Sequence, residues 1–90
     1  MTVIKKKAWP ELFKKVLDGE KDFDLRLADF DVKEGDTLIL EEYYPKSKKY
    51  SGRKIEKKVS FVMKTKDLSF WSKDEMEKYG FIVMSLKHEN

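Results

Sequence analysis

The stretch Gly19–Asp36, GEKDFDLRLADFDVKEGD, decides the fold of this chain, and we expect the remaining segments to pack around it. Its first glycine is the residue type that ends helices, and the stretch closes on a Gly-Asp turn. Apolar and charged residues alternate over residues 23–27, which predicts a strand with one apolar and one charged face. We expect the apolar face to be buried and Asp24 and Arg26 to point the same way, within about 7 Å. This pair is either a solvated ion pair or part of a polar site.

The segments around this stretch predict a small α+β domain. Pro10 suits the first turn of a helix because it has no N–H to satisfy there. The expected elements are, in order, a short strand at Val3 and Ile4, a helix over 10–17, strands over 23–27, 37–44 and 55–64, a helix between Ser72 and Gly80, and a strand over 81–86. This order lacks the strand and helix rhythm of a parallel sheet. We therefore expect a mixed sheet that curls toward a barrel and is flanked by two short helices.

Alternation in the strands and the apolar stripe of the first helix predict one hydrophobic core. Its expected members are Leu12, Phe13, Val16, Phe23, Leu25, Leu38, Leu40, Val59, Phe61 and Val83. Glu42 shares the phase of the leucines on its strand, so its carboxylate falls on the packed face. A charge there needs a partner or a place at a mouth open to water. The polar residues expected together at the mouth of the barrel are Lys21, Asp24, Arg26 and Glu42.

Composition limits the classes of function. The chain has 90 residues, 40% of them hydrophobic, so we expect one domain over residues 1–90. It has no cysteine and one histidine, His88 in an end segment expected to fray, so we expect neither a metal site nor a cofactor. Charged residues reach 41%, yet the net charge is only +3, which indicates a mixed surface. With no membrane-spanning run and no signal-peptide core, we expect a soluble, cytoplasmic protein without a membrane partner. We also expect a monomer.

A basic run with interspersed tyrosines follows the strand over 37–44. Basic side chains meet phosphates, and tyrosines can stack on unpaired bases. The residues concerned are Tyr43, Tyr44, Lys46, Lys48, Lys49, Tyr50, Arg53 and Lys54. Lysine-rich hairpins also occur because charge keeps an edge strand from aggregating. From the residues alone, RNA binding and a solvated hairpin are equally supported.

Three segments resemble the ASCH domains of the PUA-like superfamily: WPELFKKVLDGEKDFDLRLADFDVKEGDTLILEEYYP, YSGRKI and GFIVMSL. The resemblance covers nearly the whole chain and is closest to a small uncharacterised ASCH-related branch. It implies a PUA-like β-barrel flanked by helices, with a cleft thought to bind RNA. A related bacterial branch implies an amidohydrolase that acts on an acetylated cytidine nucleoside.

Under this resemblance, Lys21 takes the place of the catalytic lysine of the hydrolase branch, and Arg26 that of its strand arginine. Asp24 stands where that branch has a threonine nucleophile, which weakens the hydrolase alternative. The polar positions that recur in the uncharacterised branch fall on Asp24, Arg26, Asp29, Glu42 and Arg53. Phe30 and Ile4 stand where that branch has an arginine and a histidine.

The sequence therefore predicts an RNA-binding or nucleotide-binding module with a polar cleft. A small amidohydrolase of acylated nucleosides is the alternative. The predicted ligand-binding residues are Lys21, Asp24, Arg26, Glu42, Lys48, Lys49, Tyr50 and Arg53. If the protein is an enzyme, the expected catalytic residues are Lys21, Asp24 and Glu42. The expected partner is RNA or a nucleotide or nucleoside, and only the enzyme would release acid or amine from an acylated nucleoside.

Overall fold

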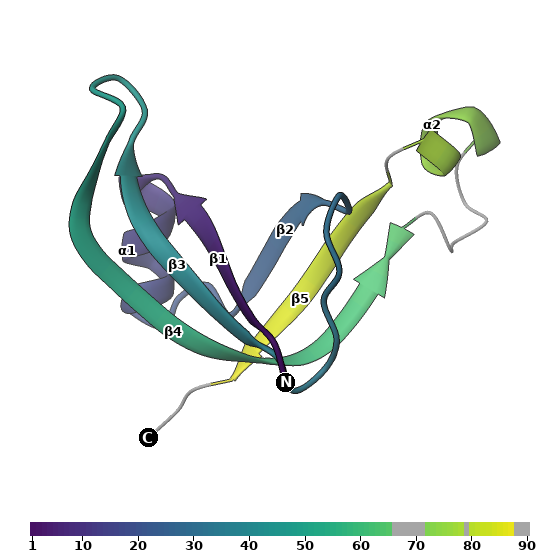
Figure 1. Ribbon diagram of the computed structural model, residues 1–90, viewed down its shortest axis with the longest axis horizontal. Coiled ribbons are helices and arrows are strands. Elements are labelled where there is room, and N and C mark those ends of the chain that lie inside the picture. The colour runs from purple at the N-terminus through teal and green to yellow at the C-terminus, as the bar shows by residue number, and fades with distance from the viewer. Residues whose placement is uncertain (66–71, 79, 88–90) are drawn as a thin grey trace.

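The computed structural model describes residues 1–65, 72–78 and 80–87. It shows a small mixed α+β fold in which a five-stranded sheet curls into a half-barrel with two short helices (Figure 1). Its elements are β1 (Val3–Ala8), α1 (Pro10–Leu17), β2 (Phe23–Leu27), β3 (Thr37–Tyr44), β4 (Lys49–Lys64), α2 (Lys73–Lys78) and β5 (Phe81–Lys87). The predicted order of elements is confirmed, although β1 is longer than expected and β4 begins earlier. Of the end predicted to fray, residues 87–90, Lys87 belongs to β5, and His88 and the two residues after it lie outside the described residues.

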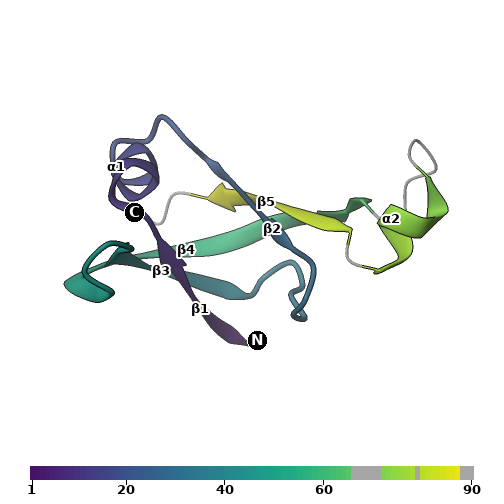
Figure 2. The same ribbon diagram turned by 90° about the horizontal axis from the view of Figure 1, so that it is seen from above.

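The sheet is open, with β1 at one edge and β2 at the other. Its strand order is β1-β3-β4-β5-β2, in which β1 and β3 are parallel and the other neighbours are antiparallel. Figure 2 shows α1 lying to one side of the strands. The two edges approach each other, because Arg26 Nη2 on β2 donates a 2.9 Å hydrogen bond to the Lys7 carbonyl on β1. This contact holds the half-barrel in its curl.

Asp36 anchors the long connection between β2 and β3. Its carboxylate accepts hydrogen bonds from the backbone N–H groups of Thr2 (3.0 Å) and Lys33 (2.8 Å). The adjacent Gly35 has a φ of +95°, which favours glycine, so the predicted Gly-Asp turn has a conformational reason. The hydrogen bond from Thr2, followed by that from Lys33, lowers the pKa of Asp36. Because Thr2 precedes β1, this one carboxylate fixes the turn and the start of the edge strand together.

One core fills the space between α1 and the inner face of the sheet. Its buried members are Ala8, Phe13, Val16, Val32, Leu38, Leu40, Val59, Ile82, Met84 and Leu86. The predicted burial of two α1 residues, Phe13 and Val16, is confirmed. The same holds for the strand residues Leu38, Leu40 and Val59. From the apolar run of β5, alternate residues enter the core; the prediction that Val83 is one of them is wrong, because it lies on the other face and is only half-buried.

The predicted orientation of β2 is wrong. Asp24 is 5% exposed and lies on the inner face, whereas Phe23 and Leu25 are about half exposed on the outer face. An alternating strand has two different faces, and the neighbours that pack on it decide which one is buried. Here the inner face of β2 borders a pocket beside α1 and the end of β1, and its charged side chains pair with each other, with Lys21 and with the Lys7 carbonyl.

The predicted burial of Phe61 is also wrong, and so is that of Leu12. A register shift lies between Val59 and Phe61 in the pairing of β4 with β5, so Val59 points inward and Phe61 points outward. A bulge of this kind adds a residue and inverts the alternation beyond it. Leu12 is about half exposed because the side of α1 that carries it borders a pocket instead of the core.

Candidate functional site

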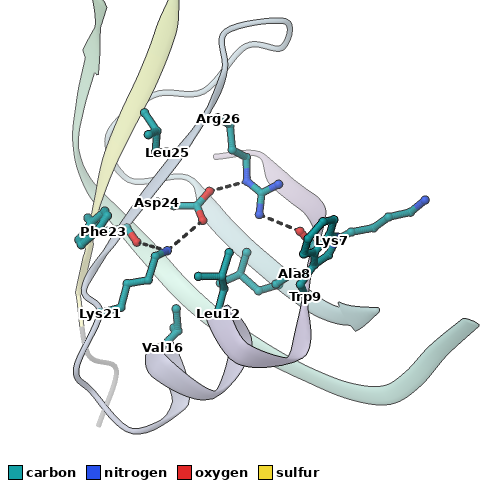
Figure 3. A pocket seen from close by; sticks show the side chains of 11 residues that line it. Lys7, Ala8, Trp9, Leu12, Val16, Lys21, Phe23, Asp24, Leu25 and Arg26 are labelled. Atoms are coloured by element: carbon teal, nitrogen blue, oxygen red, sulfur yellow. Dashed lines mark hydrogen bonds and ion pairs between the residues drawn. The ribbon is translucent and has the colours of Figure 1, made fainter. Parts of the chain in front are cut away.

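A pocket of about 600 Å³ opens between α1, the end of β1 and the edge strand β2 (Figure 3). Its volume is typical of small-molecule sites in proteins. The residues that line it are Lys7, Ala8, Trp9, Leu12, Val16, Lys21, Phe23, Asp24, Leu25, Arg26 and Leu40. Apolar side chains form most of the wall, and a few polar side chains converge from β2 and the turn after α1. That combination is the usual make-up of a binding site.

Asp24 is the polar centre of this pocket. Arg26 Nε donates a hydrogen bond to its Oδ2, and Lys21 Nζ lies 3.6 Å from its Oδ1. Lys21 is fixed there because its Nζ also donates a 2.7 Å hydrogen bond to the Phe23 carbonyl. The Asp24 side chain is only 7% exposed, a depth at which a carboxylate needs paired charges. One carboxylate therefore lies between two cations at the wall of an open pocket.

Arg26 joins this carboxylate to the opposite edge of the sheet. Its Nε bonds Asp24, and one Nη2 proton bonds the Lys7 carbonyl. A guanidinium carries five N–H donors in one plane. Within the described residues, Nη1 of Arg26 donates no hydrogen bond, so part of this planar donor set remains for a ligand.

The apolar wall beside the polar centre comes from the start of α1. Trp9 is the N-cap residue, and both Trp9 and Leu12 are about half exposed at the pocket. Trp9 is not among the predicted site residues, although the sequence held a signal for it. In a Trp-Pro pair at a helix start, the tryptophan occupies the extended N-cap position, here with φ −66° and ψ 153°, outside the packed stripe.

Glu42 lies apart from this pocket, which corrects the prediction that it joins the other polar residues at the barrel mouth. Its buried carboxylate accepts two hydrogen bonds of 3.0 Å from Arg53 on β4, one from Nε and one from Nη2. The Arg53 guanidinium also lies 5.1 Å from the centre of the Phe13 ring. The side-chain hydrogen bonds lower the pKa of Glu42 and raise the pKa of Arg53. Arg53 is therefore bound to the Glu42 carboxylate at the edge of the core.

Acid should weaken the protein partly through Glu42. Because its folded-state pKa is depressed, the pair contributes stability above the unfolded-state pKa, about 4.3 for Glu, and loses it as pH falls through the folded-state value. We expect Glu42→Gln to lower the melting temperature at neutral pH and the gap to wild type to narrow below about pH 4. Thermal unfolding followed by circular dichroism measures this gap. Glu56→Gln, an exposed control on β4, should show little gap at any pH, and an unchanged Glu42→Gln gap under acid would contradict the assignment.

The β3–β4 hairpin carries the predicted basic and aromatic residues. Lys48 and Lys49 are exposed at its tip, where Lys48 adopts a φ of +57°. Tyr50 packs edge-to-face on Tyr43, with ring centroids 5.0 Å apart, and remains about half exposed. Lys7 Nζ lies 4.3 Å from the Tyr43 centroid and 6.0 Å from that of Tyr50. The hairpin thus combines cations with an accessible aromatic ring.

A smaller pocket of about 180 Å³ lies between the start of α1 and the start of the hairpin. The residues that line it are Trp9, Pro10, Glu11, Tyr44, Pro45 and Lys46. Trp9 therefore lines both pockets. Lys7 also lines the first pocket while its ammonium group reaches Tyr43. The polar centre and the hairpin are neighbours through these two residues.

Two further properties bear on function. Among residues 1–65, 72–78 and 80–87, no group of three or more His, Asp or Glu side chains is arranged to hold a metal ion. The helices in this part of the chain are too short and too polar to cross a membrane.

Of the four polar residues predicted to meet at the mouth of the barrel, the structure brings together Lys21, Asp24 and Arg26. The fourth, Glu42, pairs with Arg53 elsewhere.

The fold and pocket define a small α+β half-barrel in which an acidic and basic cluster lies between the sheet edges. The chain belongs to the family described as "Domain of unknown function (DUF3850)", whose model matches residues 4–86. It is similar to the solved structure titled "Crystal structure of hypothetical protein PH0355", with a TM-score of 0.64 and 17% identity over 97% of this chain and 98% of that chain. At this identity, the likeness shows the fold alone. No curated protein matches the chain.

Proposed function

We propose that this protein is an RNA-binding or nucleotide-binding module of the PUA-like (ASCH) type, and that its larger pocket holds a nucleobase. The observation that carries the proposal is the pair of buried Asp24 and partly exposed Arg26 in a pocket rimmed by the exposed Trp9. The carboxylate supplies acceptors, the guanidinium supplies planar donors, and the indole supplies a stacking face. A base presents donors and acceptors in one plane beside a flat ring, so this arrangement suits it.

The surroundings of the pocket favour a ligand with a phosphate backbone. Beyond Trp9, the smaller pocket leads to the hairpin, where Lys48 and Lys49 are exposed and the Tyr50 ring is accessible. Single-stranded nucleic acid is typically bound by cations that meet phosphates and by aromatic rings that stack on bases. We infer that the base in the pocket belongs to a single-stranded or looped RNA whose neighbouring nucleotides lie along the hairpin.

Binding of short single-stranded RNA should weaken steeply with salt, because each phosphate that a lysine neutralises releases counterions. Each such phosphate contributes a slope of about −0.7 in log affinity against log salt concentration.

Tyr50→Ala should weaken RNA binding about tenfold through lost stacking and leave nucleoside binding in the pocket unchanged. Fluorescence anisotropy at two ionic strengths measures both effects. Phe81→Ala, which removes an exposed ring on the outer face of the sheet, is the matched control. Salt-independent binding, or no binding at low ionic strength, would contradict the proposal.

The alternative function is hydrolysis of an acylated nucleoside in the same pocket. One observation favours it: Lys21 Nζ lies 3.6 Å from Asp24 and is only slightly exposed, so an amine and a carboxylate share a pocket of suitable size. Of the expected catalytic residues, however, Glu42 is bound to Arg53 outside the pocket. Incubation with an acetylated cytidine distinguishes the functions, since release of acetate would establish the hydrolase and binding without turnover would support the module.

A further inference from the structure

The outer face of the sheet carries a continuous apolar surface that the pocket does not explain. We define the outer patch as the side chains of Phe23, Leu25, Leu27, Phe61, Met63 and Phe81, which are 38–57% exposed. They lie on three neighbouring strands, β2, β5 and β4. Figure 3 shows Phe23 on the side of β2 away from Asp24. Large exposed apolar side chains scattered singly are normal, but a contiguous group indicates an interaction surface.

Strand register makes these side chains contiguous. In one row, Leu25 is paired with Val83, and Val83 is paired with Met63. In the neighbouring row, Phe23 is paired with Ser85, and Ser85 with Phe61. On the other side of Leu25, Leu27 is paired with Phe81. Directly paired residues have Cβ atoms about 4.5–5.5 Å apart, so the rows form one apolar surface, and the Lys21 ammonium group lies beside it, 4.8 Å from the centre of the Phe23 ring.

The two edge strands of the sheet differ in how well they are protected against association with another chain. β1 carries Lys5, Lys6 and Lys7 in succession, and lysines protect an edge strand from pairing with another chain. β2 turns its own charges inward, so its outer face shows only apolar residues beside an unpaired edge. An apolar outer face at a free edge is the arrangement that promotes association between sheets.

We propose that the outer patch is the interface of a homodimer, with a second copy of this chain as its occupant. The patch presents roughly 500 Å² of apolar area per copy, since its three Phe side chains each offer about 150–250 Å² when fully exposed and its Leu and Met side chains add to this. Two copies together would withdraw roughly 1,000 Å² before any rim is counted, which reaches the lower limit for a specific interface. A neutral, apolar patch complements itself, and homodimer interfaces are more apolar than transient ones. The net charge of +3 per copy opposes this only weakly, because salt screens it.

The dimer also bears on the pocket. Phe23 and Leu25 belong to the outer patch and to the lining of the larger pocket. A second copy on the patch would therefore lie next to one rim of each pocket and give the dimer two sites. The dimer inference rests on burial and register alone, so it stands or fails independently of the ligand. A dimer differs from the monomer expected from the sequence.

Sedimentation equilibrium from about 1 μM to 1 mM protein tests the dimer. We expect the wild-type mass to double with concentration, and Leu25→Lys and Met63→Lys each to weaken the dimer at least about 100-fold, because every dimer carries the substitution twice. Val3→Lys is the matched control, since Val3 is 59% exposed on the opposite edge strand. It should leave the dimer unchanged.

Amide shifts of the wild-type protein provide a second measurement that needs no substitution. Dilution should move the amide resonances of Leu25, Met63 and Phe81 and leave those of the hairpin in place. A wild-type chain that stays monomeric over the whole range would overturn the proposal and leave the patch to a different partner. A dimer that both patch substitutions leave intact would overturn it as well, because the contact would then lie on another face.

Discussion

Phe13→Ala should lower the free energy of unfolding by about 3–5 kcal/mol, a large share of the stability of a small domain. Phe13 is 1% exposed and is among the largest fully buried side chains of the core. Truncation to alanine removes its transfer free energy and leaves a cavity that α1 and the sheet can fill only in part. The substitution also removes the Phe13 ring, which lies beside the Arg53 guanidinium. That guanidinium binds the Glu42 carboxylate. Urea denaturation in dilute solution measures the loss.

Phe61→Ala is the matched control for this measurement. The same atoms are deleted, but Phe61 is 51% exposed on the outer face, so the loss in dilute solution should be about 0.5 kcal/mol or less. Dilution matters because self-association through the outer patch would add to the apparent stability of the wild type. Equal losses from the two substitutions would show that the bulge in β4 does not invert its faces as described.

The second large effect is expected at Arg26. Arg26→Lys keeps the positive charge beside Asp24 but loses the planar donor set, so affinity for a nucleobase ligand should fall about 10-fold to 100-fold. Stability should fall by only about 1 kcal/mol, since the hydrogen bond to the Lys7 carbonyl is lost while the lysine ammonium group replaces Nε as the partner of Asp24. Arg53→Lys is the matched control, because it makes the same chemical change at the Glu42 pair and should reduce stability while pocket affinity persists. Titration calorimetry and thermal unfolding measure the two quantities.

Local signals in the sequence were sufficient for the elements of the fold. Pro10 and Gly19 delimit α1, and the Gly35-Asp36 turn precedes β3, because helix ends and turns depend on residues a few positions apart. The phase of β3 was also predictable, since Leu38 and Leu40 lie on its buried face.

The faces of β2 and β4 were not predictable from alternation. β2 has charges on its inner side because α1 and the end of β1 border a pocket there, and the Lys7 carbonyl, 19 residues from Arg26 in sequence, accepts a hydrogen bond from it. In β4 a single bulge inverts the pattern beyond Val59, and nothing in the local residue types marks it. Tertiary contacts therefore decide which face of each strand is buried, and the alternating pattern alone does not specify that face.

The polar cluster was predictable only in part for the same reason. Lys21, Asp24 and Arg26 are close in sequence, and a turn followed by a strand is enough to bring them together. Glu42 was correctly expected on the packed face and in need of a partner, but the choice of Arg53 depends on how β3 and β4 pair across their register shift.

The central claim is that a base or nucleotide binds at the Asp24–Arg26 pair, and amide-shift mapping with nucleosides, nucleotides and short RNAs tests it most directly. The result expected is a set of shifts centred on Lys21, Asp24 and Arg26, together with the indole N–H of Trp9, and its extension to Tyr50 only with RNA. The first four positions line the larger pocket, and Tyr50 lies on the hairpin against Tyr43. Shifts confined to the hairpin, or no shifts with any of these ligands, would contradict the claim.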